Sequence, residues 1–313
     1  MGFSPIPPAV DTSLIVPVLT LTAQHSDAGL VQLEIPWTVL LADTAAATEV
    51  RVVRLPLVQY YRATHRLVTV ALDVTNGLNR AAEAQPLVDA GRSITDTAVQ
   101  RRYREYVAAV DSILHPDYLS LAAETNLIRA LAPAPVYQAV VQMTNAAAAE
   151  RKAHGSTTPL MISVQVETAW GKLLNGPFLG IATDLTDFPF MTAIGLSSYP
   201  YLGGFATPEA IPLDYYSRLT GGTGLRPVVL EGGWPSDGYG SSPAVQARYI
   251  ARQAELLTAA RGVALHQITF TDLVENLAPN LGPFSRLGLV DTLLNPKAAL
   301  AVWDSVLALP YRR

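Results

Sequence analysis

The sequence predicts an α/β protein, a single (β/α)8 TIM barrel that occupies residues 1–313 as one catalytic domain, and three observations predict it. Short apolar runs rich in β-branched residues alternate with longer amphipathic stretches along the whole chain. Several of the runs are apolar on both faces, which is typical of parallel strands buried between a core and covering helices. No glycine-rich turn follows the first strand, and no linker rich in Pro, Gly and Ser divides the chain. A closed barrel is therefore favoured over an open, doubly wound sheet.

Eight strands and four well-marked helices are expected from these patterns. The strands are expected at residues 2–8, 30–37, 67–75, 117–126, 160–168, 191–201, 226–234 and 263–273. The helices are expected at residues 95–114, 135–153, 241–262 and 296–309. Thr95 is expected to cap the first of these helices, and Pro135 suits the first turn of the second. Two Ser and Pro243 begin the third, and Gly262 ends it.

Composition excludes several classes of partner. Hydrophobic residues make up 50% of the chain and charged residues 15%, against a usual charged share of about 25%. The formal net charge of −4 offers no basic surface to a nucleic acid or an anionic membrane. The longest uncharged stretches, residues 130–149 and 188–208, contain Pro and other polar breaks, so neither resembles a membrane-spanning helix. We expect no nucleic-acid partner, no membrane partner and a monomer.

Metal and cofactor chemistry is not indicated either. The chain has no Cys, which excludes disulfides, thiolate metal sites and cysteine nucleophiles. Its five His show no metal-ligand spacing: His25, His65, His115, His154 and His266. No phosphate-binding loop and no nucleophile elbow are present. We therefore expect no cofactor.

Two carboxylates follow apolar runs at the ends of expected strands. Glu124 ends the fourth strand and Glu231 ends the seventh. In a barrel the loops after the strands meet at one face, so these two side chains are expected to oppose each other across its mouth. Paired carboxylates are the groups that glycoside hydrolysis needs, one as acid and the other as nucleophile or base. The alternative is that each carboxylate caps a helix N-terminus or pairs with an Arg.

Three segments resemble barrel glycoside hydrolases. VVLEGGWPSDG at 228–238 resembles the nucleophile segment of plant-type endo-β-1,3-glucanases, glycoside hydrolase family 17. IGLSSYPY at 194–201 is similar to the sixth-strand segment of family 53 endo-β-1,4-galactanases. GLVDTLLNPKAALAVW at 288–303 resembles the closing segment common among such barrels. With the strand order, the resemblance spans roughly residues 117–303.

The resemblance implies a retaining hydrolase of the clan in which the acid/base follows strand 4 and the nucleophile follows strand 7. It assigns the acid/base to Glu124, the nucleophile to Glu231, and a hydrogen bond to that nucleophile to Tyr199. The clan normally has Asn before the acid/base, where this chain has Ala123. Asn126 is therefore expected to bind the sugar in its place. The resemblance also favours a secreted or periplasmic protein, although the chain begins without a visible signal peptide.

Further residues at predicted strand ends are candidates for sugar binding. Sugars stack on aromatic rings, and Trp37, Trp170, Trp234 and Tyr201 follow strands. Core packing is the alternative for each, and it is the expected role of Trp303. Glu167 ends strand 5 and is expected to contact substrate. Asp73 lies near the end of strand 3 and is also a candidate for binding sugar hydroxyls. Pairing with Arg129 is the alternative for both Glu167 and Asp73.

The sequence thus predicts a retaining glycoside hydrolase that acts on a β-linked polysaccharide or oligosaccharide. Ala123 motivates the alternative, a carbohydrate-binding barrel that has lost catalysis. A lyase or aldolase with a Schiff-base Lys is disfavoured, because Lys152, Lys172 and Lys297 all lie outside the expected strands.

Overall fold

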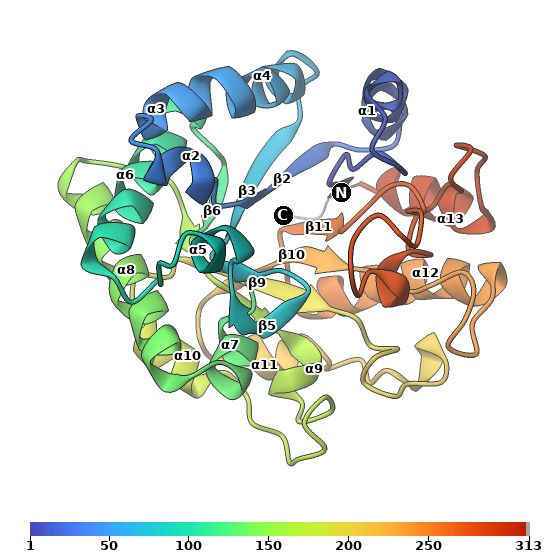
Figure 1. The fold of residues 1–313 in the computed structure, drawn as a ribbon. Helices are drawn as coiled ribbons and strands as arrows, with labels where there is room; N and C mark the ends of the chain where they lie inside the picture. Colours follow the sequence, from blue (N-terminus) through green and yellow to red (C-terminus); the bar gives the residue numbers. More distant parts are fainter. Residues whose placement is uncertain (311–313) are drawn as a thin grey trace. The chain divides into compact units, whose positions relative to one another are not determined.

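Parallel strands joined by helices make up the frame of residues 1–310, the part of the chain that the computed structural model describes (Figure 1). The strands of the main sheet are β1 (Gly2–Phe3), β2 (Ala28–Glu34), β3 (Leu67–Asp73), β6 (Tyr118–Ser120), β7 (Leu160–Met161), β8 (Ser163–Gln165), β9 (Ala193–Ser198), β10 (Arg226–Gly232) and β11 (Ala264–Gln267). Their order is β7-β6-β3-β2-β1-β11-β10-β9-β8. Only Ile162 separates β7 from β8, so the order starts and ends in one segment. This is the connectivity of the predicted (β/α)8 barrel.

The chain forms two compact units, and each is described by itself. Unit 1 contains residues 1–30, 166–180 and 196–310, and unit 2 contains residues 31–165 and 181–195. Strands β2 and β9 each contribute residues to both units.

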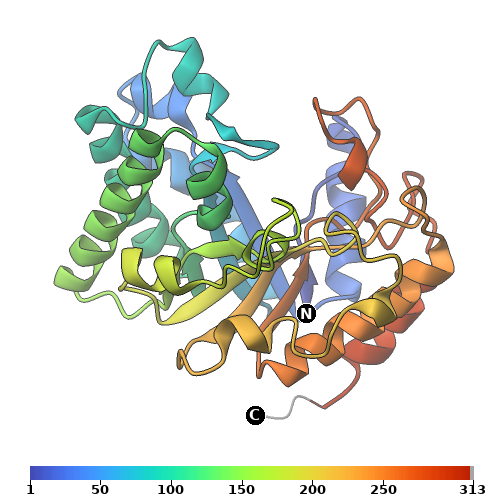
Figure 2. The same ribbon diagram turned by 90° about the horizontal axis from the view of Figure 1, so that it is seen from below.

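Unit 2 contains a parallel sheet covered by long helices. Strand β6 pairs in parallel with β3 and with β7. Helices α6 (Thr97–Leu114) and α8 (Ala134–Ala153) lie side by side (Figures 1 and 2). Strands β4 (Thr75–Asn76) and β5 (Asn79–Glu83) form an antiparallel hairpin after β3. The remaining helices of this unit are α2 (Trp37–Leu41), α3 (Ala46–Glu49), a π-helix (Val50–Arg54), α4 (Leu55–Ala63), α5 (Gln85–Asp89), α7 (Thr125–Leu131) and α10 (Ala182–Asp187).

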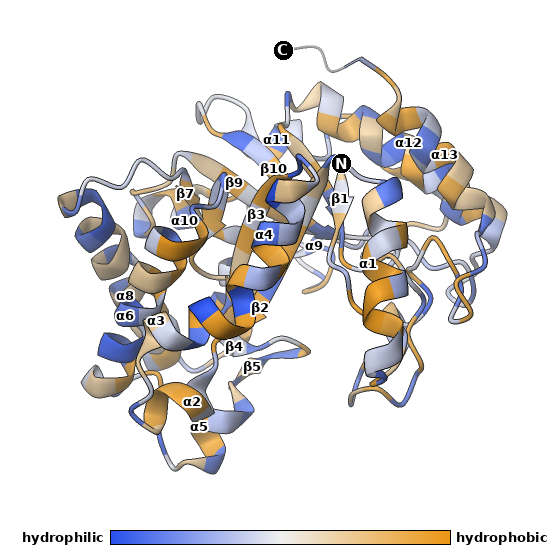
Figure 3. Ribbon diagram, turned by 90° about the horizontal axis from the view of Figure 1, so that it is seen from above, coloured by the Kyte–Doolittle hydropathy of each residue, from blue (hydrophilic) through white to orange (hydrophobic). Residues whose placement is uncertain are grey.

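Unit 1 contains parallel pairings of its own. Strand β1 pairs with β2 and β11, and β11 pairs with β10. Helices α12 (Pro243–Ala259) and α13 (Ala298–Leu307) pack side by side (Figure 3). Helix α12 begins as predicted, because the Ser242 side chain accepts a hydrogen bond from the Val245 N–H and Pro243 fills the first turn. The remaining elements are α1 (Ile15–Gln24), α9 (Val166–Ala169), α11 (Ser217–Thr220), and 3-10 turns at Thr12–Leu14, Pro208–Ala210 and Gly282–Phe284.

Several predicted boundaries are wrong. The strands predicted at 2–8 and 117–126 reduce to the short strands β1 and β6. Asp96 rather than Thr95 occupies the N-cap position of α6. Helices α1 and α4 were not predicted from the sequence. Within residues 1–310, every helix is too short or too polar to span a membrane.

Candidate active site

Glu124 lies at a backbone bend between β6 and α7. The strand ends at Ser120, the next three residues bend, and Glu124 adopts a left-handed backbone with φ of 49°. Its N–H donates to the Ser163 hydroxyl at 2.9 Å. Although Glu124 occupies the N-cap position of α7, its side chain does not cap the helix. A strained left-handed residue that is not Gly persists only where its surroundings hold it, and such residues cluster at functional sites.

The Glu124 side chain belongs to a buried ionic group that we call the Glu124 cluster: Asp73, Thr75, Arg80 and Glu124. Arg80 Nε donates to Glu124 Oε2 at 2.8 Å, and Arg80 Nη1 donates to Asp73 Oδ1 at 2.5 Å. The same Nη1 lies 3.2 Å from the Thr75 hydroxyl. Arg80 is only 4% exposed, so one buried guanidinium bridges two buried carboxylates. The non-catalytic alternatives for Glu124 were helix capping and pairing with an Arg. The structure shows the pairing with an Arg.

Glu34, at the end of β2, responds to the same charges. Burial raises the pKa of its carboxyl, repulsion by Asp73 raises it further, and Arg80 opposes both effects. The electrostatic influence of the Glu124 cluster therefore extends to the neighbouring strand.

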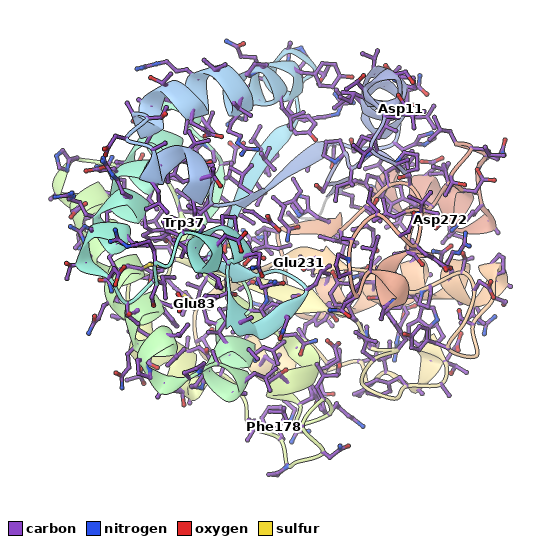
Figure 4. All side chains as sticks on the ribbon, viewed as in Figure 1. Asp11, Trp37, Glu83, Phe178, Glu231 and Asp272 are labelled. Atoms are coloured by element: carbon purple, nitrogen blue, oxygen red, sulfur yellow. The ribbon has the colours of Figure 1, made fainter. Side chains whose placement is uncertain are left out.

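Glu231 is the last residue but one of β10, and its side chain is buried (Figure 4). The Tyr199 hydroxyl donates to Glu231 Oε2 at 3.2 Å. Tyr199 directly follows β9, so two adjacent strands deliver the pair. This contact joins the two residues that the family resemblance singled out as nucleophile and nucleophile partner.

A second carboxylate supports the Tyr199 backbone. Glu167, in α9, has no exposed surface. Its Oε1 accepts from the hydroxyls of Ser198 at 3.2 Å and Tyr215 at 2.9 Å, and its Oε2 accepts from the Tyr199 N–H at 3.0 Å. We call Glu167, Ser198, Tyr199, Tyr215 and Glu231 the Glu231 cluster. Both oxygens of Glu167 accept hydrogen bonds inside the protein, and its predicted substrate contact stays a prediction.

Asn126 is also engaged internally. Its Nδ2 donates to the Gln165 carbonyl at 2.9 Å, and its Oδ1 accepts from the Gln165 N–H at 2.8 Å. The amide thus ties the first turn of α7 to the end of β8. Because both amide atoms are in use and the side chain is buried, the structure does not support the expected sugar contact.

The predicted aromatic platform is largely packed inside the protein. Trp37 (labelled in Figure 4) begins α2 instead of ending a strand. Both Trp37 and Trp234 are 1% exposed. Trp234 Nε1 donates to the Ser241 hydroxyl at 2.9 Å. Tyr201 is buried and donates to the Pro283 carbonyl at 2.8 Å. All three rings are packed against the protein interior, and their sugar contacts stay a prediction.

Trp170 is the exception, because it remains partly exposed. Its Nε1 donates to the Tyr215 carbonyl at 2.9 Å, and its ring stacks on Tyr215 with 5.0 Å between centroids. The Arg218 guanidinium lies 5.0 Å from the same ring. Trp170 therefore buttresses the Glu231 cluster, and its predicted sugar contact stays a prediction.

Sequence reasoning missed Arg80 and Tyr215. Arg80 lies on β5, and the Asn76-Gly77 dipeptide was a usable hairpin signal for that segment. Nothing in the sequence marks Tyr215 as a partner of Glu167. Asp73 pairs with Arg80, and Arg129 pairs with Asp184 at 2.9 Å, so the suggested pairing of Asp73 with Arg129 is wrong.

A further buried ion pair lies in unit 1, where Asp272 (Figure 4) meets Lys297 at 2.5 Å. Lys297 also donates to the Ser236 hydroxyl at 2.8 Å, and burial lowers the pKa of its amine. Ser236 follows β10, so this pair ties the loop after Glu231 to the C-terminal segment. Across residues 1–310, no three His, Asp or Glu side chains gather in a way that could hold a metal ion.

Solved structures resemble this chain, although no protein-family model and no curated protein sequence match it. An exo-β-1,4-mannosidase from an Opitutaceae bacterium aligns with a TM-score of 0.70 and 16% identity, over 97% of this chain and 58% of its own. The present chain thus spans less than two thirds of that protein. A GH5_18 variant from Bifidobacterium longum, crystallised with Manβ1-4GlcNAc, aligns with a TM-score of 0.68 and 14% identity. The alignment covers 100% of this chain and 80% of that protein. Xylanase 10B from Thermotoga maritima aligns with a TM-score of 0.65 and 15% identity, over 98% of this chain and 94% of its own.

These alignments cover nearly the whole chain, so they confirm the predicted (β/α)8 fold class. They also confirm, at the level of fold, the predicted resemblance to barrel glycoside hydrolases. The narrower resemblance to families 17 and 53 stays a prediction. Identities of 14–16% show fold and nothing finer.

Proposed function

We propose that this protein is a retaining glycoside hydrolase that cleaves a β-linked polysaccharide or oligosaccharide. The contact between the Tyr199 hydroxyl and Glu231, at the ends of β9 and β10, carries the proposal. The fold it shares with a mannosidase and a xylanase supports it. We further propose that residues 1–313 act as one catalytic domain, with Glu231 as nucleophile and Glu124 as acid/base.

The proposed reaction has two steps. Glu124 donates a proton to the glycosidic oxygen as the bond from that oxygen to the anomeric carbon breaks, and a Glu231 oxygen bonds to that carbon. Glu124 then takes a proton from water as the water oxygen attacks the anomeric carbon and releases Glu231. The two inversions give net retention, and the reaction consumes one water per bond cleaved.

Tyr199 suits the nucleophile role proposed for Glu231. A phenol is a neutral donor, so its hydrogen bond orients one carboxylate oxygen without supplying a counter-charge. Orientation matters because reacting atoms must meet in a near-attack geometry. Burial also removes water that would otherwise compete for the carboxylate.

A carbohydrate-binding barrel without catalysis is the second candidate, and the Glu124 cluster favours it. Arg80 occupies Glu124 Oε2, Ala123 stands where the clan has Asn, and Asn126 is bonded to Gln165. A protein of this kind binds the sugar through its polar groups but releases no product.

Turnover assays separate the two candidates. The panel should begin with β-1,4-mannan and xylan, because neighbours named for these linkages share the fold. It then extends to β-1,3-glucan, β-1,4-galactan and the matching aryl β-glycosides. We expect reducing ends from one polymer, and β-configured product as the first anomer in NMR spectra. Sugar binding by calorimetry without product would support the binding barrel.

Two variants test the catalytic roles. Glu124→Gln and Glu231→Gln should each lose at least about 100-fold in kcat, while Glu105→Gln, on the exposed face of α6, should not. With an active aryl β-glycoside and azide, Glu231→Ala should yield the α-glycosyl azide and Glu124→Ala the β-glycosyl azide. Equal activity of either Gln variant and the wild type would overturn that residue's role.

A further inference from the structure

Glu167 is linked to the proposed nucleophile, Glu231, through hydrogen bonds of a single residue. Its Oε2 accepts from the Tyr199 N–H, and the hydroxyl of the same Tyr199 donates to Glu231. Backbone and side chain of one residue therefore connect a fully buried carboxylate to the carboxylate proposed to attack the substrate. All three residues belong to unit 1.

The backbone that Glu167 holds is the end of a strand. Ser198 is the last residue of β9 and Tyr199 follows it. Glu167 receives the hydroxyl of the first and the N–H of the second. It therefore fixes the point at which the chain leaves the sheet, and this point sets the direction of the Tyr199 ring.

The carboxylate is itself held firmly. The Tyr215 hydroxyl donates to it at 2.9 Å, and the Tyr215 ring is stacked on Trp170 and meets Phe205 edge-on. Gly203 packs so closely that a Cβ there would lie 3.0 Å from Glu167 Cγ. A site supported in this way keeps its geometry within the small tolerance that catalysis needs.

Keeping a carboxyl group here is costly. Burial raises the pKa of Glu167 to about 7, although hydrogen bonds from Tyr199, Tyr215 and Ser198 oppose the shift. One oxygen of this costly group accepts from Tyr199 and the other from Ser198 and Tyr215, so the carboxyl is satisfied entirely by the residues it positions.

We propose that Glu167 is a positioning residue that fixes Tyr199 against Glu231 and so orients the nucleophile. The inference rests on the hydrolase proposed above and deepens it. It replaces the sugar contact expected for Glu167 from its place at a strand end.

The test compares Glu167→Ala with Glu167→Gln in the full chain. Ala removes the hydrogen bonds from Ser198, Tyr199 and Tyr215. Gln keeps them, because its oxygen can accept from the Tyr199 N–H while its NH2 donates to the two hydroxyls, which turn to accept. We expect Ala to lower kcat by about 10- to 100-fold with KM within about threefold. We expect Gln to stay within about threefold of the wild type.

A double-mutant cycle with Tyr199→Phe asks whether Glu167 acts through the Tyr199 hydroxyl. In the Phe background, Glu167→Ala should cost less than about threefold, because the contact it maintains is already gone. Glu209→Gln is the matched control, since it neutralises a carboxylate of the same unit that is 58% exposed and pairs only on the surface with Arg248. It should retain most of the activity. Additive losses in the cycle would overturn the proposal.

A crystallographic readout needs no substrate and separates this proposal from the proposed function. In Glu167→Ala the Tyr199 hydroxyl should move out of hydrogen-bond distance of Glu231, and in Glu167→Gln it should stay. An unmoved Tyr199 in the Ala variant would overturn the positioning role, whatever the activity. A displaced Tyr199 in a protein whose wild type turns over no glycoside would support positioning and refute the hydrolase. If the Ala variant does not fold, Glu167→Asp, which shortens the reach to Tyr199, gives the same comparison.

Discussion

Replacing Arg80 with Met tests whether one guanidinium holds the Glu124 cluster together. Met keeps an unbranched apolar stem but removes the cation that Asp73 and Glu124 share. Both carboxylates then remain buried without that partner. The loss of a buried ion-pair partner is strongly destabilising, because an uncompensated buried charge is left behind.

The magnitude follows from burial. Side-chain exposures of 3%, 4% and 9% for Arg80, Asp73 and Glu124 place the whole group out of water. Breaking such a pair costs about 3–5 kcal/mol of unfolding free energy. With the usual unfolding entropy per residue and 313 residues, this corresponds to a fall in Tm of about 5–8 °C.

Calorimetry or thermal circular dichroism at neutral pH measures the shift, and Arg92→Met is the matched control. Arg92 pairs with Asp96 at 2.7 Å, but their side chains are 40% and 38% exposed. Such surface pairs contribute about 0–1 kcal/mol. Adding Asp73→Asn to Arg80→Met should restore part of the lost stability, because it removes one orphaned charge. If Arg80→Met lowers Tm no more than Arg92→Met, the ionic account of the Glu124 cluster is refuted.

Two further predictions concern Asn126 and His266, and both are measured by urea unfolding. Asn126→Ala removes two buried hydrogen bonds to the Gln165 backbone and should cost about 1–3 kcal/mol; unchanged stability would contradict the structural role of Asn126. Burial lowers the pKa of His266 to about 4, below its ordinary 6.5. The unfolded chain therefore takes up this proton first as the pH falls, and stability is lost between about pH 6.5 and 4. From pH 7.5 to 4.5 the free energy of unfolding of the wild type should fall by about 2.5 kcal/mol more than that of His266→Gln. The same fall in both proteins would contradict the prediction for His266.

The fold class could be predicted because the hydrophobic pattern of the sequence indicates the alternation of strands and helices. Strand ends could not, since apolar residues continue beyond the last paired residue. Leu121 to Ala123 extend the apolar run of β6, yet the chain bends there to place Glu124 in its left-handed conformation. The missed helix α1 leaves Ile15 and Val16 exposed, so its apolar residues do not follow the one-sided pattern by which helices are recognised.

The candidate site also has a part that the sequence predicts and a part that it does not. Position at a strand end singled out Glu124 and Glu231, because parallel strands present their carboxyl ends at one edge of a sheet, and the family resemblance added Tyr199. Partners could not be located, since Arg80 precedes Glu124 by 44 residues and no spacing rule connects them. The sequence also could not predict whether an aromatic ring in a loop points into the protein or towards solvent. The same loop that buries Trp234 leaves Tyr239 56% exposed, between two Gly that, like Tyr239, have positive φ.

The two predicted carboxylates are held by different chemistry, and this difference bears on the choice between hydrolase and binding barrel. Glu231 accepts a hydrogen bond from the Tyr199 phenol, which is a neutral donor. Glu124 shares a guanidinium with Asp73, so part of its charge is balanced by the protein itself. An acid/base must release and accept a proton in every cycle, whereas a sugar-binding carboxylate needs only to accept hydrogen bonds. The Glu231 cluster suits both functions. The pairing of Glu124 with Arg80 is therefore the contact that bears most directly on the choice between the two functions.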